Sequence, residues 1–429
     1  MSVTIHEVQK LRDVVTLEKG KPPAQQPYFG SDAELYLTPE YLRGRAPAQP
    51  VKPSANAVRV SDDDTILLWD GSNAGEFFRA RKGILASTMS RISHDDAFDK
   101  EYFFYAVKNW ELYLKGQTSG SGIPHVDKEV LGKLEIYQFE KSEQAKIAEI
   151  LSTVDRAIEQ TEALIAKQQR IKTGLLQDLL TRGIDEHGNL RSEKTHKFKN
   201  SPLGRIPVEW GVDEFGRTLE SAVDGPFGSN LKSDHYVAEP GVRVIRLGNI
   251  GNGKFLDQDK AWVSSEHGRY LSRHSVQPKD LLIASLGDER HPFGRACIYT
   301  DYVHEAIVKA DVFRIRCNRE RYIHPFAVHL FNFPRWRQGL FALAQGMTRD
   351  RVNLTNLMSL QLPIPPIAEQ EAIACTISSL YTFLDELEQQ LAKLLSLKTG
   401  LMQDLLRGKK RVTALLSSVD VNDKKKGVS

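Results

Sequence analysis

Two short loops in this chain combine a glutamine, a glycine and hydroxyl side chains in corresponding places. Residues 117–121 read Gln-Thr-Ser-Gly-Ser and residues 345–349 read Gln-Gly-Met-Thr-Arg, with Gly120 and Gly346 separated by 226 positions. Hydroxyl groups and glycine N–H groups are suitable donors to phosphate oxygens. The chemistry that these loops predict is the binding of a phosphate-bearing ligand.

Basic side chains are concentrated in one part of the sequence. Residues 290–351 contain 11 Lys or Arg against 5 Asp or Glu, although the whole chain has a formal net charge of only +3. Such a stretch is typical either of a nucleic-acid contact or of a solvated positive face. Residues 243–247 and 312–316 alternate apolar and basic side chains, as half-buried strands do, so we expect two strands that each present arginines on one face.

Motifs for the common catalytic chemistries are absent from the sequence. It contains no P-loop, no dinucleotide fingerprint, no Asp/Asn-Pro-Pro-aromatic tetrapeptide, no H-E-x-x-H, no G-x-S-x-G and no cysteines with zinc spacing. Scattered Asp and Glu residues leave a metal-dependent nuclease site open as an alternative. We expect a binding protein that is not an enzyme, with no metal site and no cofactor of its own.

The cysteines and the hydropathy pattern indicate a compartment. Cys297, Cys317 and Cys375 are far apart in the sequence and belong to no paired motif, which is typical of a reducing cytoplasm. The sequence contains no apolar run of about 18 residues and no charged-then-apolar leader, so we expect no membrane segment.

Two long helices are the elements that would position the binding groups. Residues 172–180 read Lys-Thr-Gly-Leu-Leu-Gln-Asp-Leu-Leu and residues 398–406 read Lys-Thr-Gly-Leu-Met-Gln-Asp-Leu-Leu, again 226 positions apart. Apolar residues around both copies recur at alternating spacings of four and three, the period of a coiled-coil seam. Each helix would be about 57 Å long at 1.5 Å per residue. The predicted seam residues are Ile147, Leu151, Val154, Ile158, Ile165, Leu175, Leu179, Ile373, Ile377, Leu380, Leu384, Leu387, Leu391, Leu394, Leu401 and Leu405.

The two apolar stripes are expected to bury each other. An isolated helix with such a stripe is unstable in water, so we predict an antiparallel intramolecular coiled coil. The polar seam residues Thr161 and Gln168 would help to fix its register. Homodimerisation is the ordinary alternative for any single heptad stripe.

Each long helix follows a larger mixed segment, which predicts an α+β chain with approximate internal two-fold symmetry. The predicted parts are a first mixed α/β domain at 1–140, a first long helix at 141–183, a linker at 184–208, a second mixed domain at 209–366, a second long helix at 367–408 and a basic, disordered tail at 409–429.

Five stretches carry a family resemblance, and they lie at residues 172–183, 203–210, 225–250, 279–288 and 362–370. The last of these, Leu-Pro-Ile-Pro-Pro-Ile-Ala-Glu-Gln, joins a double proline to the start of a long helix. On these stretches the chain resembles the specificity subunit of type I restriction-modification enzymes over essentially its whole length. The first domain departs from the pattern, because residues 134–140 lack the double proline and the domain begins without a Gly-x-Ile-Pro-x-x-Trp sequence.

The resemblance implies a recognition subunit that performs no chemistry. Each mixed domain would be a target recognition domain that reads one half of an asymmetric bipartite site in double-stranded DNA through the major groove. The helices would set the spacer between the half-sites and dock two modification subunits. Those partners would methylate adenine at N6 with S-adenosylmethionine, and restriction subunits would use ATP and Mg to translocate and cut, as a defence against phage.

For DNA contacts we predict basic and hydroxyl side chains on loops between strands. Arg can bridge guanine O6 and N7, while Lys and hydroxyl groups more often meet phosphate. For any single basic residue, a surface salt bridge is an equally good interpretation. The predicted contacts in the first domain are Arg79, Arg81, Lys82, Lys115, Thr118, Ser119 and Ser121. Those in the second domain are Ser229, Lys232, Arg243, Arg246, Arg290, Arg295, Thr348, Arg349 and Arg351.

Two other function classes compete with this interpretation. A coiled-coil scaffold whose mixed domains bind protein would share the helices, but the basic excess at 290–351 argues against it. A self-contained nuclease or methyltransferase is disfavoured by the missing motifs.

Overall fold

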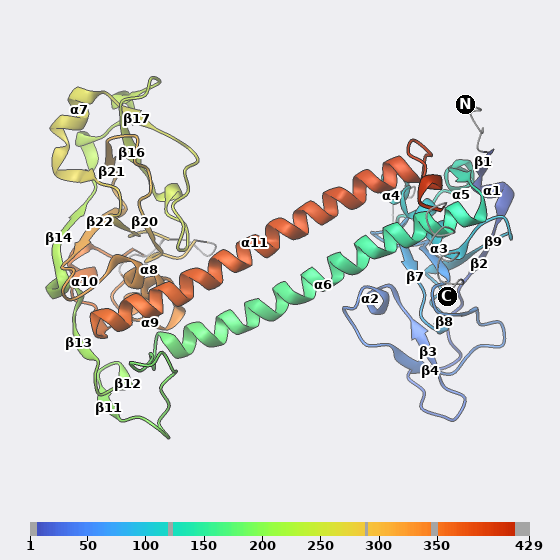
Figure 1. The fold of residues 1–429 in the computed structure, drawn as a ribbon, viewed down its shortest axis with the longest axis horizontal. Coiled ribbons are helices and arrows are strands. Elements are labelled where there is room, and N and C mark those ends of the chain that lie inside the picture. Colours follow the sequence, from blue (N-terminus) through green and yellow to red (C-terminus); the bar gives the residue numbers. More distant parts are fainter. Residues whose placement is uncertain (1–6, 119–122, 288–290, 345–350, 417–429) are drawn as a thin grey trace, which may run out of the picture. The chain divides into compact units, whose positions relative to one another are not determined.

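The computed structural model describes residues 7–118, 123–287, 291–344 and 351–416 (Figure 1). The chain divides into two units. Unit 1 consists of residues 1–164 together with 387–429, and unit 2 consists of residues 165–386. Each unit therefore contains one mixed domain and a part of both long helices.

Unit 1 is built on two four-stranded sheets and one strand pair. The first sheet is antiparallel with strand order β2-β9-β6-β7, and the second, with order β4-β3-β8-β5, is mixed because β3 and β8 run parallel. Its strands are β1 (Glu7–Lys10), β2 (Val15–Lys19), β3 (Glu34–Leu37), β4 (Gln49–Val51), β5 (Arg59–Val60), β6 (Thr65–Leu68), β7 (Phe77–Arg79), β8 (Gly83–Leu85), β9 (Met89–His94) and β10 (Glu135–Gln138). Its shorter helices are α1 (Leu11–Val14), α2 (Pro39–Leu42), α3 (Lys100–Lys108), α4 (Glu111–Gly116) and α5 (Lys128–Lys133).

Unit 2 repeats this plan with different residues. Its antiparallel sheet has the order β14-β22-β19-β20, and its mixed sheet has the order β15-β17-β16-β21-β18, in which β16 and β21 run parallel. Its strands are β11 (Phe198–Ser201), β12 (Gly204–Pro207), β13 (Gly211–Glu214), β14 (Leu219–Asp224), β15 (Tyr236–Val237), β16 (Val242–Ile245), β17 (Trp262–Val263), β18 (Ser275–Val276), β19 (Leu281–Ala284), β20 (Ala296–Ile298), β21 (Ala306–Val308), β22 (Val312–Cys317) and β23 (Gln361–Ile364). Its shorter helices are α7 (Ser265–Tyr270), α8 (His324–Asn332), α9 (Pro334–Ala342) and α10 (Leu354–Met358).

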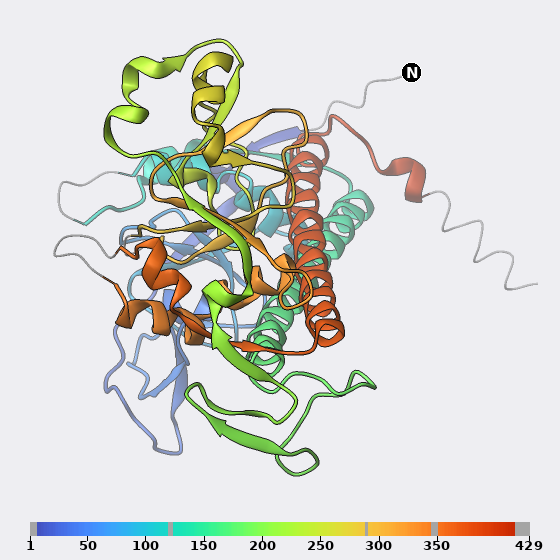
Figure 2. The same cartoon turned by 90° about the vertical axis from the view of Figure 1, so that its left-hand side faces the viewer.

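The two mixed domains share a topology. Strands β2, β9, β6 and β7 occupy the places of β14, β22, β19 and β20, and the antiparallel pair β1–β10 matches the pair β13–β23. The match includes β10, which lacks the proline of β23. Unit 2 adds the β11–β12 hairpin, coloured green in Figure 2. The predicted α+β fold with two mixed domains is confirmed.

The long helices α6 (Lys141–Leu179) and α11 (Ile367–Leu405) have 39 residues each and pack together. In unit 1, Ile147 near the start of α6 shares a core with Leu405 at the end of α11. In unit 2, Leu179 at the end of α6 shares a core with Ile373 near the start of α11. The helices are therefore antiparallel within each unit, and every predicted seam residue is buried or half-buried.

A glutamine in the first turn of each long helix ties the helix to its own mixed domain. In unit 1 the Gln144 side chain donates to the carbonyls of Phe139 and Ala97, at 2.7 and 2.9 Å, and accepts from the Asp99 N–H. In unit 2 Gln370 donates to the carbonyls of Pro365 and Arg321, both at 2.9 Å, and accepts from the Ile323 N–H. Both side chains are fully buried with their amide groups satisfied, so this repeated residue has a structural role.

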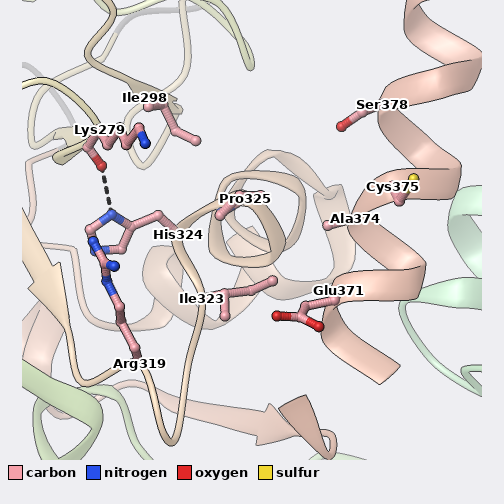
Figure 3. Close-up of a pocket in the computed structure, with 10 residues that line it drawn as sticks. All are labelled: Lys279, Ile298, Arg319, Ile323, His324, Pro325, Glu371, Ala374, Cys375 and Ser378. Atoms are coloured by element: carbon pink, nitrogen blue, oxygen red, sulfur yellow. Dashed lines mark hydrogen bonds between the residues drawn. The ribbon is translucent and has the colours of Figure 1, made fainter. Parts of the chain in front are cut away.

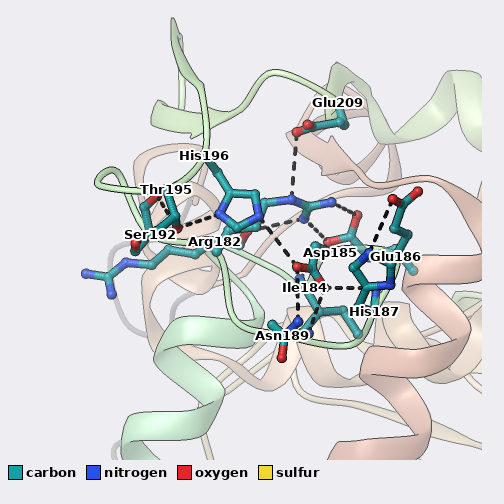
Figure 4. Close-up of polar contacts among 12 residues, drawn as sticks. Arg182, Ile184, Asp185, Glu186, His187, Asn189, Ser192, Thr195, His196 and Glu209 are labelled. Atoms are coloured by element: carbon teal, nitrogen blue, oxygen red, sulfur yellow. Dashed lines mark hydrogen bonds and ion pairs between the residues drawn. The ribbon is translucent and has the colours of Figure 1, made fainter.

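The glutamate that precedes this glutamine is also repeated, as Glu143 and Glu369. Its carboxylate binds residues that follow the end of the opposite long helix. Glu369 accepts hydrogen bonds from the Ile184 N–H and from Arg191 and Trp210. The start of the linker after α6, which Figure 4 shows around Ile184 and Asp185, therefore lies against the start of α11. In unit 1, Glu143 accepts two hydrogen bonds from Arg411, and Val412 is buried. Residues 409–416, which we expected to belong to a disordered tail, therefore contribute to the packing of unit 1.

Candidate nucleic-acid interface

Three loops of unit 2 meet beyond one end of its antiparallel sheet. Leu286, two residues after β19, forms an isolated β-bridge with Arg351, and the Val352 N–H donates to the Ser285 carbonyl at 2.9 Å. The guanidinium of Arg351 pairs with Asp311 at 2.7 Å and lies over the ring of Phe227 at 5.2 Å. Phe227 is 48% exposed. This combination places a cation, an exposed aromatic ring and the Gly228–Asn230 turn on one surface.

Unit 1 has a corresponding arrangement at the same end of its antiparallel sheet. Asp70, two residues after β6, forms an isolated bridge with His125, and the Gly71 N–H donates to the Pro124 carbonyl at 2.9 Å. His125 and Arg351 are 226 positions apart. The segments 119–122 and 345–350, which precede them, lie outside the described residues, but their flanks occupy equivalent positions in the two units.

The predicted contact residues separate into four groups. The exposed group is Arg81, Lys82, Ser229 and Lys232. The half-buried group consists of Thr118 and of basic residues that already pair with an acid, Arg79, Lys115, Arg246 and Arg351. The buried group is Arg243 and Arg295. Ser119, Ser121, Arg290, Thr348 and Arg349 lie outside the described residues.

Comparisons with known proteins decide the family. A family model described as the type I restriction modification DNA specificity domain matches residues 6–168 and 275–396. The chain is also 31% identical over 418 residues to the specificity subunit of the type I restriction enzyme MjaVIII from Methanocaldococcus jannaschii, with 95% of this chain and 94% of that one covered. The chain belongs to the type I restriction-modification specificity subunits. It is thus a non-catalytic DNA specificity subunit.

More distant relatives agree with this assignment. The specificity subunit of the type I restriction enzyme EcoBI from Escherichia coli is 23% identical over 354 residues, covering 81% of this chain and 73% of that one. The crystal structure of a type I restriction-modification S subunit from M. genitalium aligns with a TM-score of 0.57 at 15% identity, covering 95% of this chain and 97% of that one. The second likeness concerns the fold alone.

Arg243 is removed from the predicted DNA contacts of the specificity subunit. Its side chain is 0% exposed, lies over the ring of Phe255 at 5.1 Å and pairs with Asp257 and, at 2.8 Å, with Asp301. Burial raises the pKa of Asp301, but the Val303 N–H, His304 and Arg243 outweigh it and lower that pKa. A buried guanidinium must be paired, and these acids neutralise the charge of Arg243 inside the mixed sheet through its Nη1.

Arg295 is removed for the same reason. The residue is only 6% exposed, and its guanidinium donates to backbone carbonyls that include those of Ile250 at 2.6 Å and Leu247 at 3.0 Å. It fixes the turn after β16 against the loop after β19. Arg295 therefore supports the candidate interface from within and does not reach its surface.

Much of the basic excess of residues 290–351 is either buried or paired with acids. Arg314 and Arg337 are buried, Arg316 pairs with Asp280 at 2.7 Å, and Arg321 pairs with Asp213 at 2.9 Å. The positive stretch in the sequence is thus not a continuous positive surface. Sequence reasoning also missed Phe227, although its Gly-Pro-Phe-Gly-Ser stretch carried part of the family resemblance.

The predicted residues of unit 1 lie at two different ends of β7. Lys115 is at the loop end, where Glu111 accepts from Lys115 at 3.0 Å and from the Phe77 N–H at 2.9 Å. Burial raises the pKa of Glu111, but Lys108, Phe77 and Lys115 outweigh it and lower that pKa. Arg79 and Arg81 lie at the other end of β7, around a cavity of about 620 Å³ that α6 also lines. They do not belong to the same loop set as Lys115.

A further cavity of about 690 Å³ lies between α8 and the first turns of α11 (Figure 3). Its floor is apolar, and Lys279, Arg319 and Glu371 stand around it with the exposed thiol of Cys375. Among the residues that the structure describes, no three His, Cys, Asp or Glu side chains are grouped to hold a metal ion. No helix in the described ranges is long and apolar enough to cross a membrane.

Proposed function

We propose that each mixed domain of this specificity subunit reads one half of an asymmetric bipartite site in double-stranded DNA. The observation that carries the proposal is the equivalent placement of the two loop sets, at Asp70 and His125 in unit 1 and at Leu286 and Arg351 in unit 2. Shared topology provides the same binding surface twice. Different loop residues give the two half-sites different sequences.

In unit 2 the DNA contact centres on Arg351 and Phe227. The Arg351 side chain is 42% exposed and held by Asp311, so its remaining N–H groups have a fixed direction toward an incoming base edge or phosphate. The exposed ring of Phe227 offers an apolar surface for a thymine methyl group or a sugar. Ser229 and Lys232 on the same loop supply donors to phosphate oxygens.

The helix pair sets the distance between the two half-sites. A 39-residue helix is about 58 Å long, which sets an upper scale of about 17 base pairs. One heptad corresponds to about 10 Å, or about three base pairs. Deleting residues 161–167 and 387–393 together should shorten the preferred spacer by about that amount, and an unchanged spacer would reject this part of the proposal.

The outer faces of the helices dock two modification subunits. Large apolar side chains are exposed on them away from the seam, namely Leu164, Ile171, Phe383, Leu395 and Leu397. S-adenosylmethionine, ATP and Mg act through the modification and restriction partners. The double variant Leu395→Asp and Leu397→Asp should lose co-purification with the modification subunit, whereas Thr399→Asp, which is also exposed, should keep it.

The test of DNA recognition uses the target defined by methylome sequencing of the host. Binding of that duplex by the assembled complex is measured at several salt concentrations. Arg351→Ala should weaken specific binding by about 5- to 100-fold through loss of a direct contact, and Phe227→Ala should weaken it with an unchanged salt slope. Arg217→Ala, an exposed arginine paired with Asp213, is the matched control. Full affinity of both interface variants would refute the assignment, and specific binding by neither wild type nor variants would favour the scaffold alternative.

A further inference from the structure

The apolar seam of the helix pair leaves its register open. Leu380, Leu384, Leu387, Leu391 and Leu394 repeat one side chain along α11 at spacings of four and three. By the seam spacing, a shift by seven residues in either direction still places a leucine of α11, Leu387 or Leu401, opposite Ile158, so apolar packing in the middle of the seam does not distinguish the registers, whereas polar contacts do.

Thr161 does not supply such a polar contact. Its buried hydroxyl donates to the carbonyl of Ala157, at 2.7 Å, within its own helix. The Thr161 hydroxyl therefore uses its donor within α6 and gives no proton to a partner on α11.

In unit 1, one cross-helix contact joins three elements. Asp155 on α6 pairs with the ammonium group of Lys398 on α11 at 2.6 Å, and it accepts from the hydroxyl of Tyr105 on α3 at 2.8 Å. Asp155 and Lys398 each keep 25% of their side chain exposed, and Tyr105 is buried. We call this set junction 1. It connects the mixed domain, its own long helix and the opposite long helix through one carboxylate.

In unit 2, a chemically different contact joins the equivalent elements. The ammonium group of Lys172 on α6 lies 4.0 Å from the ring centroid of Tyr381 on α11. The imidazole of His329 on α8 stacks on the same ring, with centroids 5.9 Å apart and an interplanar angle of 9°. We call this set junction 2. A cation–π contact here replaces the ion pair of junction 1.

The two junctions occupy corresponding places in the duplicated chain. Lys172 and Lys398 are 226 positions apart, as are Asp155 and Tyr381. In an antiparallel helix pair, residues that face each other have residue numbers with a constant sum. That sum is 553 both for Asp155 with Lys398 and for Lys172 with Tyr381, so the two contacts belong to the same register. In both helices the lysine is the first residue of the repeated Lys-Thr-Gly sequence. Its cross-helix contact is a role for this repeated residue that apolar seam packing does not explain.

We propose that junctions 1 and 2 select the register of α6 against α11 and seat each mixed domain on that register, so that Lys172 and Lys398 are positioning residues for half-site spacing. The inference rests on the proposed function, because spacing has a meaning only if the two domains read one DNA. The lysines act through Asp155 and Tyr381 and need no contact with DNA. Their loss should therefore change which spacer is accepted before it changes how tightly a half-site is bound.

The test measures spacer discrimination. The full chain, assembled with its modification subunits, is presented with duplexes that carry the methylome-defined half-sites at the native spacer and at spacers about three base pairs shorter and longer, the displacement that a shift by one heptad produces. Wild type should prefer the native spacer. The double variant Lys172→Met and Lys398→Met should reduce the ratio of affinities by about tenfold, equivalent to about 1.4 kcal/mol.

Matched variants separate positioning from stability. Lys393→Met removes an exposed lysine of α11 that lies off the seam and should leave the ratio unchanged. The exchange Asp155→Lys with Lys398→Asp should preserve the ratio, since the pair is kept with its charges reversed, and Lys398→Arg should preserve it as well. Thermal unfolding of each variant controls for folding.

Each result supports or overturns the inference. A reduced ratio in the double variant, with recovery in the exchanged pair, supports it. An unchanged ratio, or an equal loss of affinity at every spacer, overturns it. If the wild type binds both half-sites without any spacer preference, the proposed spacing function itself is refuted. If the wild type has a spacer preference and the lysine variants keep it, only the role of the lysines is refuted.

Discussion

The buried ion pair between Arg191 and Glu369 offers a direct test of how the linker is held. The side chains of Arg191 and Glu369 are 7% and 6% exposed. Besides Arg191, the carboxylate accepts only neutral donors among the described contacts, the Ile184 N–H at 3.0 Å and the Trp210 indole at 3.1 Å. Replacing Arg191 by Met leaves a buried charge with hydrogen bonds but no counter-charge.

The expected loss follows from that burial. Breaking a buried pair from one side costs about 3–5 kcal/mol, because the remaining charge is desolvated. For a unit of this size, each kcal/mol shifts the unfolding temperature by about 2–4 °C, so the transition of unit 2 should fall by about 6–20 °C. Differential scanning calorimetry resolves this if the two units unfold in separate transitions.

Two further variants make the result interpretable. Arg205→Met breaks an exposed pair with Glu193, whose partners are 55% and 58% exposed, and should cost about 1 kcal/mol or less. Adding Glu369→Gln to Arg191→Met removes the stranded charge and should recover part of the loss. If Arg191→Met and Arg205→Met unfold at the same temperature, the reasoning from burial is wrong.

Three other predictions concern separate parts of the chain. Arg411→Met should destabilise unit 1 but not unit 2, because Glu143 is 2% exposed at its side chain and loses its cation; equal shifts in both calorimetric transitions would contradict this. Burial lowers the pKa of His329 to about 4 from 6.5, so between these pH values the unfolded chain binds a proton that the folded chain does not. Stability should fall by up to about 3 kcal/mol as the pH falls through that window, and His329→Gln should flatten the decline in urea titrations. Cys375 should react with a maleimide in the native protein, whereas Cys297 and Cys317, whose pKa burial raises to about 12, should react only after denaturation, as mass spectrometry of the labelled peptides would show.

The helices were predictable from the sequence because their signal is local. In each helix, spacings of four and three residues alternate over ten seam positions. The sequences around Lys172 and Lys398 also align with each other without a gap. The shared topology of the mixed domains was not predictable in this way. Their strands are short, they pair across distant parts of the sequence, and the residues of β10 and β23 differ although the strands occupy the same place.

The site predictions failed where a partner lies far away in sequence. The alternation in residues 243–247 indicated a half-buried strand with an exposed arginine face, but all four residues of β16 are buried because both faces of the strand are covered. Arg243 pairs with Asp301, 58 positions further along the chain. Loop positions such as Ser229 and Arg351 were easier to find, since turn chemistry and hydroxyl or basic side chains mark them locally.

The way the units share the helices also constrains the order in which the protein can fold. Unit 2 is one continuous segment, residues 165–386, whereas unit 1 needs residues 387–416 in addition to its first 164 residues. Leu405, Leu406 and Val412 belong to the same core as Leu67 and Phe103. During synthesis the ribosome releases all of unit 2 before it releases these last residues, so unit 2 can reach its native state first. The domain made first is completed last, and until then its core exposes the surface that α11 will cover.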